Sequence, residues 1–116
     1  EIEPGYAKAH NNLGVVFWSA RQPDRALSHL TQAVSADPKL AKAHSNLGIA
    51  YNGMRRPVEA LASFERALAL DPRDPQSHCG AALSHILLGR PQTARPHYET
   101  SLRLAPGCKL PPGSLP

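Results

Sequence analysis

Long apolar runs are absent from this sequence. Its apolar segments, such as Val15–Trp18, are far shorter than the ~18 residues that a membrane-spanning helix needs, so no membrane span is expected. The first residues, Glu1-Ile2-Glu3-Pro4, have neither the basic nor the apolar region of a secretory signal. Because no targeting signal is present, the default expectation is a cytoplasmic protein.

Cysteine is almost absent as well. The two cysteines, Cys79 and Cys108, are too few for a disulfide framework, and their spacing is not that of a metal-binding pair. A reducing compartment is therefore the default expectation. No sequence feature calls for a cofactor.

Proline, in contrast, is abundant, with 12 residues in a chain of 116. Together with 8 glycines, this share stays below the ~25% that marks low-complexity chains, so disorder throughout is not expected. The prolines are also regularly placed. Seven of them follow one interval of 34 residues, in two series at positions 4, 38, 72, 106 and 23, 57, 91.

A fixed interval of this length is typical of a repeat array. Residues 7–40 and 41–74 are identical at 14 of 34 positions, and residues 75–108 match the second unit at 8 of 34. The sequence therefore predicts two well-matched units and a degenerate third. Residues 1–6 read as the end of a preceding unit, so the chain is expected to be a segment of a longer array, and residues 109–116 form a proline-rich tail.

Apolar residues within each unit have helical spacing. Leu61, Phe64 and Leu68 recur at intervals of three and four residues, which favours a helix over a strand. Pro57 suits the first turn of a second helix, and Asp71-Pro72 ends that helix. Each unit is therefore predicted to be a helix, a tight turn and a second helix, whose apolar stripes are buried by neighbouring units.

The second unit resembles the tetratricopeptide repeat family, whose units carry Trp-x2-Leu-Gly-x2-Tyr, Ala-x3-Phe, then Ala and Pro. It keeps every part except the tryptophan, which His44 replaces. The first unit differs more, and the third has Ala81-Ala82 for Leu-Gly. The resemblance implies an all-α fold, an α-solenoid of three helix-turn-helix repeats wound into a right-handed superhelix.

The resemblance also implies a concave groove, lined by the first helix of each unit, that binds an extended peptide or a partner protein. Wheel geometry selects the side chains on that face. The candidate groove residues are Lys8, Asn11, Asn12, Val15, Trp18, Lys42, Ser45, Asn46, Ile49, Asn52, Gln76, Cys79 and Leu83.

Asn12 and Asn46 hold the same place in consecutive units, where an amide can bond a peptide main chain without reading its sequence. This pair resembles the asparagine ladder of O-linked N-acetylglucosamine transferases and kinesin light chains, interrupted here by Gly80. The alternative is that both amides satisfy neighbouring helix ends or water. Lys8 and Lys42 also repeat, which favours an acidic ligand, or else both are solvated surface lysines.

Chaperone-binding members of the family clamp a C-terminal carboxylate pair with lysines, an arginine and asparagines. Only Asn46 fits among the residues at the corresponding places, so binding of heat-shock chaperone tails is not expected; those residues are Asn11, Val15, Asn46, Gln76 and Gly80. Trp18, the only tryptophan, either anchors a ligand or covers the turn between its two helices.

The third unit is predicted to be the weakest. Pro96 lies inside its second helix, where a kink or a frayed start is expected. Cys79, Leu83, Ile86 and Leu87 make its groove face apolar, either for a ligand or, as we favour, for a missing neighbour. The proline-rich tail has no helical pattern, so we expect an uncovered apolar face and self-association through it.

Other functions find little support. Six histidines repeat at equivalent places, which replication of the unit explains without a metal; stacked neutral rings that replace the family's aromatic residue are the expected arrangement. No nucleotide-binding, hydrolase or protease motif occurs, so the segment is not expected to be an enzyme. The charge of +4 raises the alternative of nucleic-acid binding, but a single aromatic residue in the groove offers little base stacking, so nucleic acid is not the expected partner.

The sequence therefore predicts a protein-protein interaction module that acts as a scaffold or adaptor. Two alternatives stay open at this point. The segment could be the substrate-recruiting arm of a larger enzyme, such as a glycosyltransferase, or a scaffold that assembles through its own repeats.

Overall fold

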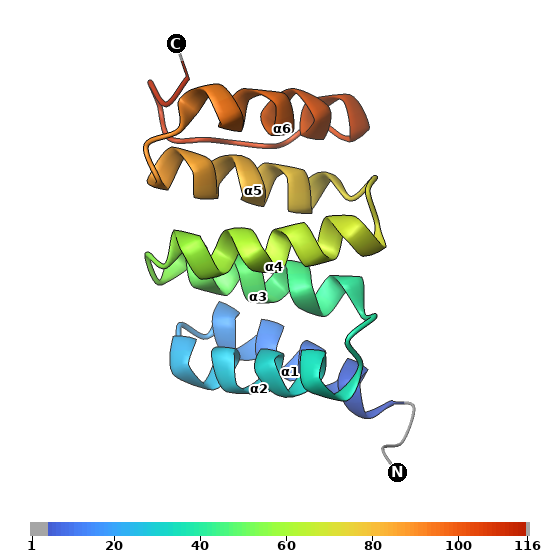
Figure 1. The fold of residues 1–116 in the computed structure, drawn as a ribbon. Coiled ribbons are helices and arrows are strands. Elements are labelled where there is room, and N and C mark those ends of the chain that lie inside the picture. Colours follow the sequence, from blue (N-terminus) through green and yellow to red (C-terminus); the bar gives the residue numbers. More distant parts are fainter. Residues whose placement is uncertain (1–4, 116) are drawn as a thin grey trace.

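The computed structural model describes residues 5–115, and within them every regular element is an α-helix (Figure 1). The prediction of an all-α array of helix pairs is confirmed. Residues 1–6 were expected from the sequence to be the end of a preceding unit; residues 1–4 lie outside the described part, and Tyr6 is the first residue of α1. The helices are α1 (Tyr6–Ser19), α2 (Pro23–Ala36), α3 (Ala41–Gly53), α4 (Pro57–Leu70), α5 (Pro75–Leu87) and α6 (Pro91–Leu104).

Proline marks the start of the second helix in each pair. Pro23, Pro57 and Pro91 occupy the first helical position, where a missing N–H costs no helical hydrogen bond. The turn before each proline contains one residue with positive φ: Arg21 at 60°, Arg55 at 61° and Gly89 at 75°. Only the third unit places a glycine, the residue best suited to this left-handed conformation, at that point.

Small residues hold the two helices of a pair together. Ala26 and Ala33 in α2, and Ala60 and Ala67 in α4, are completely buried. Leu30 then joins the first pair to the second by packing against Leu47 and Ala50 of α3. The apolar stripes that the sequence predicts are thus buried in part between units.

Phe64 joins the second pair to the third. Its ring packs against Ala81 of α5 and lies over two glycines, Gly48 and Gly80. A methyl group at Gly48 would come within 2.7 Å of the ring, and one at Gly80 within 2.1 Å. The absence of a side chain at both places is therefore what lets α3 and α5 approach the phenylalanine.

Histidines replace the aromatic residue of the family motif and form hydrogen bonds between adjacent units. The Nε2–H of His44 donates to the Pro38 carbonyl oxygen at 2.9 Å, and that of His78 donates to Pro72 at the same distance. Each bond links the first helix of a unit to the proline that ends the preceding one.

The helix α6 runs through Pro96 without a break and begins at Pro91. The expected frayed start is therefore not seen. Pro96 is the sixth residue of the helix and costs it one backbone hydrogen bond, because proline has no N–H. Packing of Ala94 and Ser101, both buried, holds the helix on either side of it.

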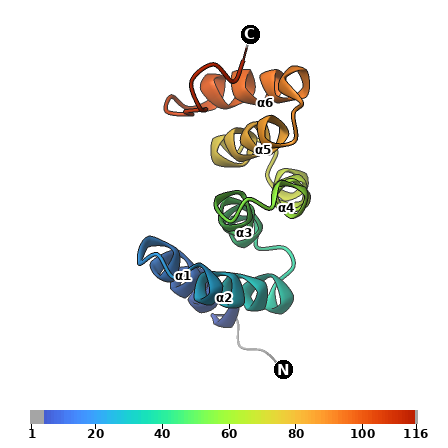
Figure 2. The ribbon, with the colours of Figure 1, turned by 90° about the vertical axis from the view of Figure 1, so that its left-hand side faces the viewer.

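The chain does not leave the array after α6. Residues 106–115, which we call the strap, run back beside α6 and above α5 on the side of α1, α3 and α5 (Figures 1 and 2). A disulfide joins Cys108 of the strap to Cys79 of α5. The spacing of the two cysteines did not predict this bond, because folding brings them together although they lie 29 residues apart.

The strap also corrects the expectation that the third unit is left uncovered. Lys109 and Pro111 lie beside Leu83 and Leu87 and share a pocket with them. The first unit has an exposed apolar face as well, where Leu13 and Val16 are 42% and 59% exposed, and Leu102 of α6 in the third unit is 41% exposed. The equivalents of Leu13 and Val16 in the second unit, Leu47 and Ala50, are 7% and 1% exposed because the first unit covers them.

Candidate functional site

The first helices of the three pairs, α1, α3 and α5, lie on one side of the array, and α2, α4 and α6 lie on the other (Figure 2). We call the surface formed by α1, α3 and α5 the groove. On the described part of this surface, two pockets are each lined by several candidate residues from more than one unit.

The first, which we call the N-terminal pocket, has a volume of about 460 Å³. The structure brings together here six of the candidate residues, which come from two different units. The lining consists of Lys8, Asn11, Asn12, Val15, Leu40, Lys42 and Asn46. Two ammonium groups and three amides around one hollow can bind carboxylates and peptide groups.

The two asparagines of the predicted ladder have different surroundings. Asn46 is half-buried, and its Nδ2 donates a hydrogen bond of 2.9 Å to Oδ1 of Asn11 in the preceding unit. Asn12 is exposed to solvent. One N–H of Asn46 is thus used between units, while its second N–H and its oxygen remain for other partners.

The second, which we call the C-terminal pocket, has a volume of about 500 Å³ and is lined mainly by apolar groups. It receives side chains from α1, α3, α5 and the strap. Its lining consists of Trp18, Ile49, Asn52, Gly53, Arg55, Gln76, Cys79, Gly80, Leu83, Leu87, Lys109 and Pro111.

Trp18 lies across the space where a side chain of Gly53 would be, because a methyl group there would fall 2.3 Å from the indole ring. The ring borders the C-terminal pocket on one side. On the other, it borders a hollow beside the inter-helix turns that includes Arg21 and Met54. The position of Trp18 is therefore compatible with both roles expected from the sequence, anchoring a ligand in the groove and covering the turn between its two helices.

Two candidate residues do not face a ligand as expected. Ser45 is completely buried, and its hydroxyl has no hydrogen-bond partner among the described residues. Asn52 is 6% exposed; its Nδ2 donates to the Gly80 carbonyl at 3.0 Å, and its Oδ1 accepts from Ser84 Oγ at 2.9 Å. Asn52 therefore joins the second and third units, because close packing of α3 on α5 turns this position inward.

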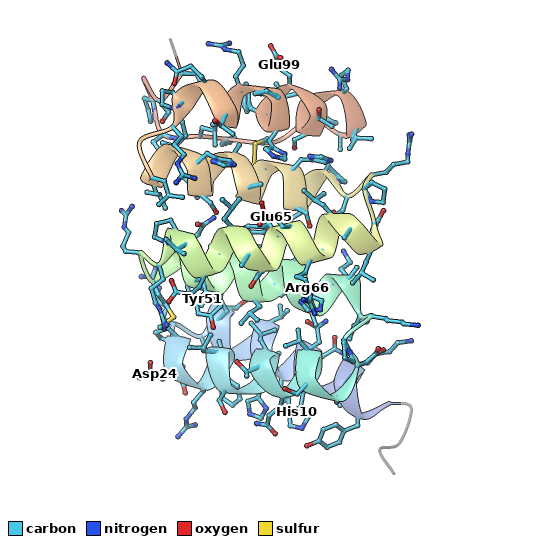
Figure 3. The ribbon with its side chains drawn as sticks, in the orientation of Figure 1. His10, Asp24, Tyr51, Glu65, Arg66 and Glu99 are labelled. Atoms are coloured by element: carbon cyan, nitrogen blue, oxygen red, sulfur yellow. A yellow bond between two sulfur atoms is a disulfide. The ribbon has the colours of Figure 1, made fainter. Side chains whose placement is uncertain are left out.

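Charge is distributed unevenly between the two sides. In the part of the chain that the structure describes, no aspartate or glutamate lines either groove pocket, whereas Lys8, Lys42, Arg55 and Lys109 do. The acidic residues Asp24, Glu65 and Glu99 lie on α2, α4 and α6 rather than on the groove helices themselves (Figure 3). The groove therefore presents positive charge, and it favours ligands that carry negative charge.

Paired histidines contact each other, and the rings of His10 and His29 are stacked as expected from the sequence, which did not predict the pairs themselves. His10 and His29 approach to 2.8 Å between their Nδ1 atoms, and His78 and His97 approach to 3.0 Å. Both pairs are 19 residues apart, and this shared spacing was the signal available in the sequence. Over the described residues, no group of three or more metal-ligating side chains is assembled.

The third unit has two histidines that resist protonation. Burial lowers the pKa of His97, and the nearby His78 and His85 lower it further. Burial also lowers the pKa of His85, with a smaller effect of Arg90 in the same direction and of Glu65 against it. His78 donates through Nε2, so in the neutral pair its Nδ1 accepts from the Nδ1–H of His97.

In residues 5–115, no helix is long enough and apolar enough to span a membrane. The described part is thus a solenoid of helix pairs with a pocketed, positively charged groove.

This architecture defines the class of helical-repeat proteins, and comparison identifies the family. The tetratricopeptide repeat family matches residues 7–40 and residues 41–74. The solved structure of a MamA point mutant is 30% identical, with 90% of this chain and 76% of that chain covered and a TM-score of 0.79. The chain belongs to the tetratricopeptide repeat family.

Other solved structures share the fold at lower identity. One is "Second TPR of Spaghetti (RPAP3) bound to HSP90 peptide SRMEEVD", with 24% identity, 86% and 93% coverage of this and that chain, and a TM-score of 0.84. Another is the first TPR domain of human RPAP3, with 22% identity, 90% and 83% coverage, and a TM-score of 0.85. No curated protein sequence matches the chain.

Proposed function

We propose that this segment is a non-catalytic interaction module whose groove binds an extended, acidic stretch of a partner protein. The observation that carries the proposal is the pairing of two pockets lined by cations and, over the described residues, by no acidic side chain. The family supports it in general terms, since relatives with this fold include TPR domains bound to peptides.

The two pockets suggest that different parts of the ligand bind at different places along the groove. In the N-terminal pocket, Lys8 and Lys42 attract carboxylates, while Asn12 and the free N–H and oxygen of Asn46 bond the peptide main chain. In the C-terminal pocket, Leu83, Leu87 and Trp18 accept an apolar side chain. An extended peptide is the ligand form that can reach both pockets at once.

The groove also suggests which acidic ligands are disfavoured. The relatives described as bound to SRMEEVD or SGPTIEEVD hold peptides that end in an acidic sequence. In this chain, Val15, Gln76 and Gly80 stand where the carboxylate clamp of chaperone-binding members has other residues. We therefore propose that the ligand is an internal acidic stretch rather than a chain terminus.

Charge reversal in the groove tests this proposal. Synthetic acidic peptides with interspersed leucines are titrated by fluorescence anisotropy against the wild type and against Lys8→Glu with Lys42→Glu. We expect binding to weaken roughly tenfold or more, and the wild-type affinity to fall with added salt. The control Lys39→Glu with Arg73→Glu makes the same change of charge at two exposed loop residues that line neither pocket, and it should retain most of the affinity.

The chemistry of the ligand's end distinguishes the alternatives. Amidating the C-terminus of the acidic peptide should leave its affinity unchanged, and the peptide SRMEEVD should bind more weakly than an internal acidic peptide. The double variant Asn12→Ala with Asn46→Ala should also bind more weakly at unchanged helix content. Equal affinity of the wild type and both groove variants would overturn the assignment of the groove as the binding site.

A further inference from the structure

The strap forms part of the groove rather than trailing from it. Lys109 and Pro111 of the strap line the C-terminal pocket together with Trp18, Leu83 and Leu87. The disulfide between Cys79 and Cys108 fixes the strap on α5, as the yellow sulfur bond in Figure 3 shows. One wall of this pocket therefore depends on a segment that lies outside the helices.

Non-covalent contacts hold the strap only weakly. Residue 109 and residues 111–113 are exposed to solvent, Leu110 and Leu115 are half-buried, and no strap residue is fully buried over the described part. Its backbone makes a local bond, from Ser114 N–H to the Pro111 oxygen at 3.1 Å, and no backbone bond connects residues 106–115 to the helices of the described part. Segments with so few buried contacts and backbone bonds detach at low free energy unless they are tethered.

The helix pair beneath the strap has its own stabilising contacts. Ala82 of α5 and Ala94 of α6 are completely buried. Ser101 of α6 donates through Oγ to the Pro75 carbonyl at 2.8 Å. The pair therefore keeps its packing when the strap is free.

The disulfide itself is open to attack. Cys79 and Cys108 are half-buried, and both border a surface hollow of about 370 Å³. The approach of an external thiolate to a disulfide sulfur is what exchange requires.

We propose that the Cys79–Cys108 disulfide is a redox-sensitive latch that holds the strap in the groove and that reduction releases. A dithiol supplies the two electrons: one thiolate breaks the bond between the protein sulfurs and forms a mixed disulfide, and the second closes the reductant's own disulfide. Cys79 and Cys108 take up two protons and become thiols. The C-terminal pocket then loses the wall that Lys109 and Pro111 provide.

The latch sets how much of α5 a ligand can reach. In the oxidised protein the groove ends in a walled pocket with Lys109 at its edge. In the reduced protein, Leu83 and Leu87 are open along the side that the strap covered. This proposal goes beyond ligand binding, and because its test uses no ligand, the two proposals can fail separately.

The experiment compares the oxidised protein with the dithiothreitol-reduced protein and with the variant Cys79→Ser plus Cys108→Ser. Trp18, the only tryptophan, reports on the pocket through acrylamide quenching. Tryptic cleavage after Lys109, followed by mass spectrometry, reports on the strap, and cleavage after Lys39 in another unit is the internal control.

We expect the Trp18 quenching constant to rise and cleavage after Lys109 to become about tenfold faster on reduction, at unchanged helix content. The double serine variant should match the reduced protein and should not respond to dithiothreitol. Identical quenching and cleavage in both redox states would overturn the latch. Loss of helix content on reduction would overturn it as well, because the disulfide would then support the helices rather than the strap.

Discussion

The first and third units bury their apolar faces in different ways. The outward face of the first unit is open over the described residues, with Leu13 and Val16 exposed to 42% and 59%. The third unit, whose sequence is the more degenerate, has the strap lying along it and covalently attached. A unit's sequence match to the family is therefore a poor guide to how well that unit is covered.

The junction between the second and third units also has more contacts than the junction between the first and second units. The first relies on Leu30, on Trp18 over Gly53, and on bonds from Asn46 to Asn11 and from His44 to Pro38. The second has Phe64 over two glycines, together with Asn52, which is bonded to both Gly80 and Ser84. The degenerate third unit is thus held by the more extensive polar and aromatic contacts, which offsets its loss of motif residues.

Replacing the apolar residue at each junction gives the largest expected effect. Phe64→Ala should lower the free energy of unfolding by about 3–5 kcal/mol, because the whole ring between α3, α4 and α5 is lost. The equivalent change Leu30→Ala should cost about 2–4 kcal/mol. Urea unfolding followed by circular dichroism measures both, and a larger cost at Leu30 would reverse the ranking of the junctions.

Removing the disulfide comes next. The cross-link closes a loop of 29 residues, so Cys79→Ser with Cys108→Ser should lower the free energy of unfolding of the third unit by about 3–4 kcal/mol through the entropy of the unfolded chain, while α5 and α6 remain helical under native conditions. The first two units should keep their stability. Hydrogen exchange resolved by helix checks this, and equal loss of protection in α1 and α5 would contradict it.

Acid should also affect the third unit selectively. The pKa values of His85 and His97 are lowered by burial, so the unfolded chain takes up protons at a higher pH than the folded one. The neutral rings of these two histidines contribute fully to the free energy of unfolding above the ordinary histidine pKa of about 6.5. This contribution is lost as the pH falls below about 6.5 toward the lower pKa values of the folded state. Unfolding midpoints between about pH 7.5 and pH 5 measure the slope.

A matched variant isolates the histidine contribution. Phe17 and Tyr51 hold the place of His85 in the other units, so His85→Phe keeps a ring there and removes a buried nitrogen that has no partner among the described residues. In this variant, the free energy of unfolding should decrease less steeply as the pH falls. An unchanged slope would assign the acid sensitivity to other groups, such as carboxylates.

The smallest effect is expected at the open face. Leu13→Gln should change the free energy of unfolding by less than about 0.5 kcal/mol, because the side chain is 42% exposed. The control Leu47→Gln, at the equivalent buried position, should cost several times more. A large cost at Leu13 would mean that this face is covered in solution, and concentration-dependent light scattering would then show whether a second copy covers it.

Much of the architecture follows from local patterns. The prolines at positions 23, 57 and 91 predict where second helices begin, because a residue without an N–H fits only the first turn. The groove pattern places Lys8, Asn12 and Lys42 around one pocket, because residues at equivalent places in stacked units lie side by side. Ser45 and Asn52 do not follow it, since the depth to which each is buried depends on how closely neighbouring helices approach.

The sequence by itself determined the repeat length, the helix boundaries and the family, because these depend on periodic residues that act within one unit. Only the tertiary structure decided which end of the array is covered, which cysteines meet and which histidines pair. Those outcomes depend on contacts between residues 19 to 29 positions apart, and no local periodicity encodes whether such residues face each other. The strap is the clearest case, since a proline-rich segment with no helical pattern lies where an uncovered face was expected.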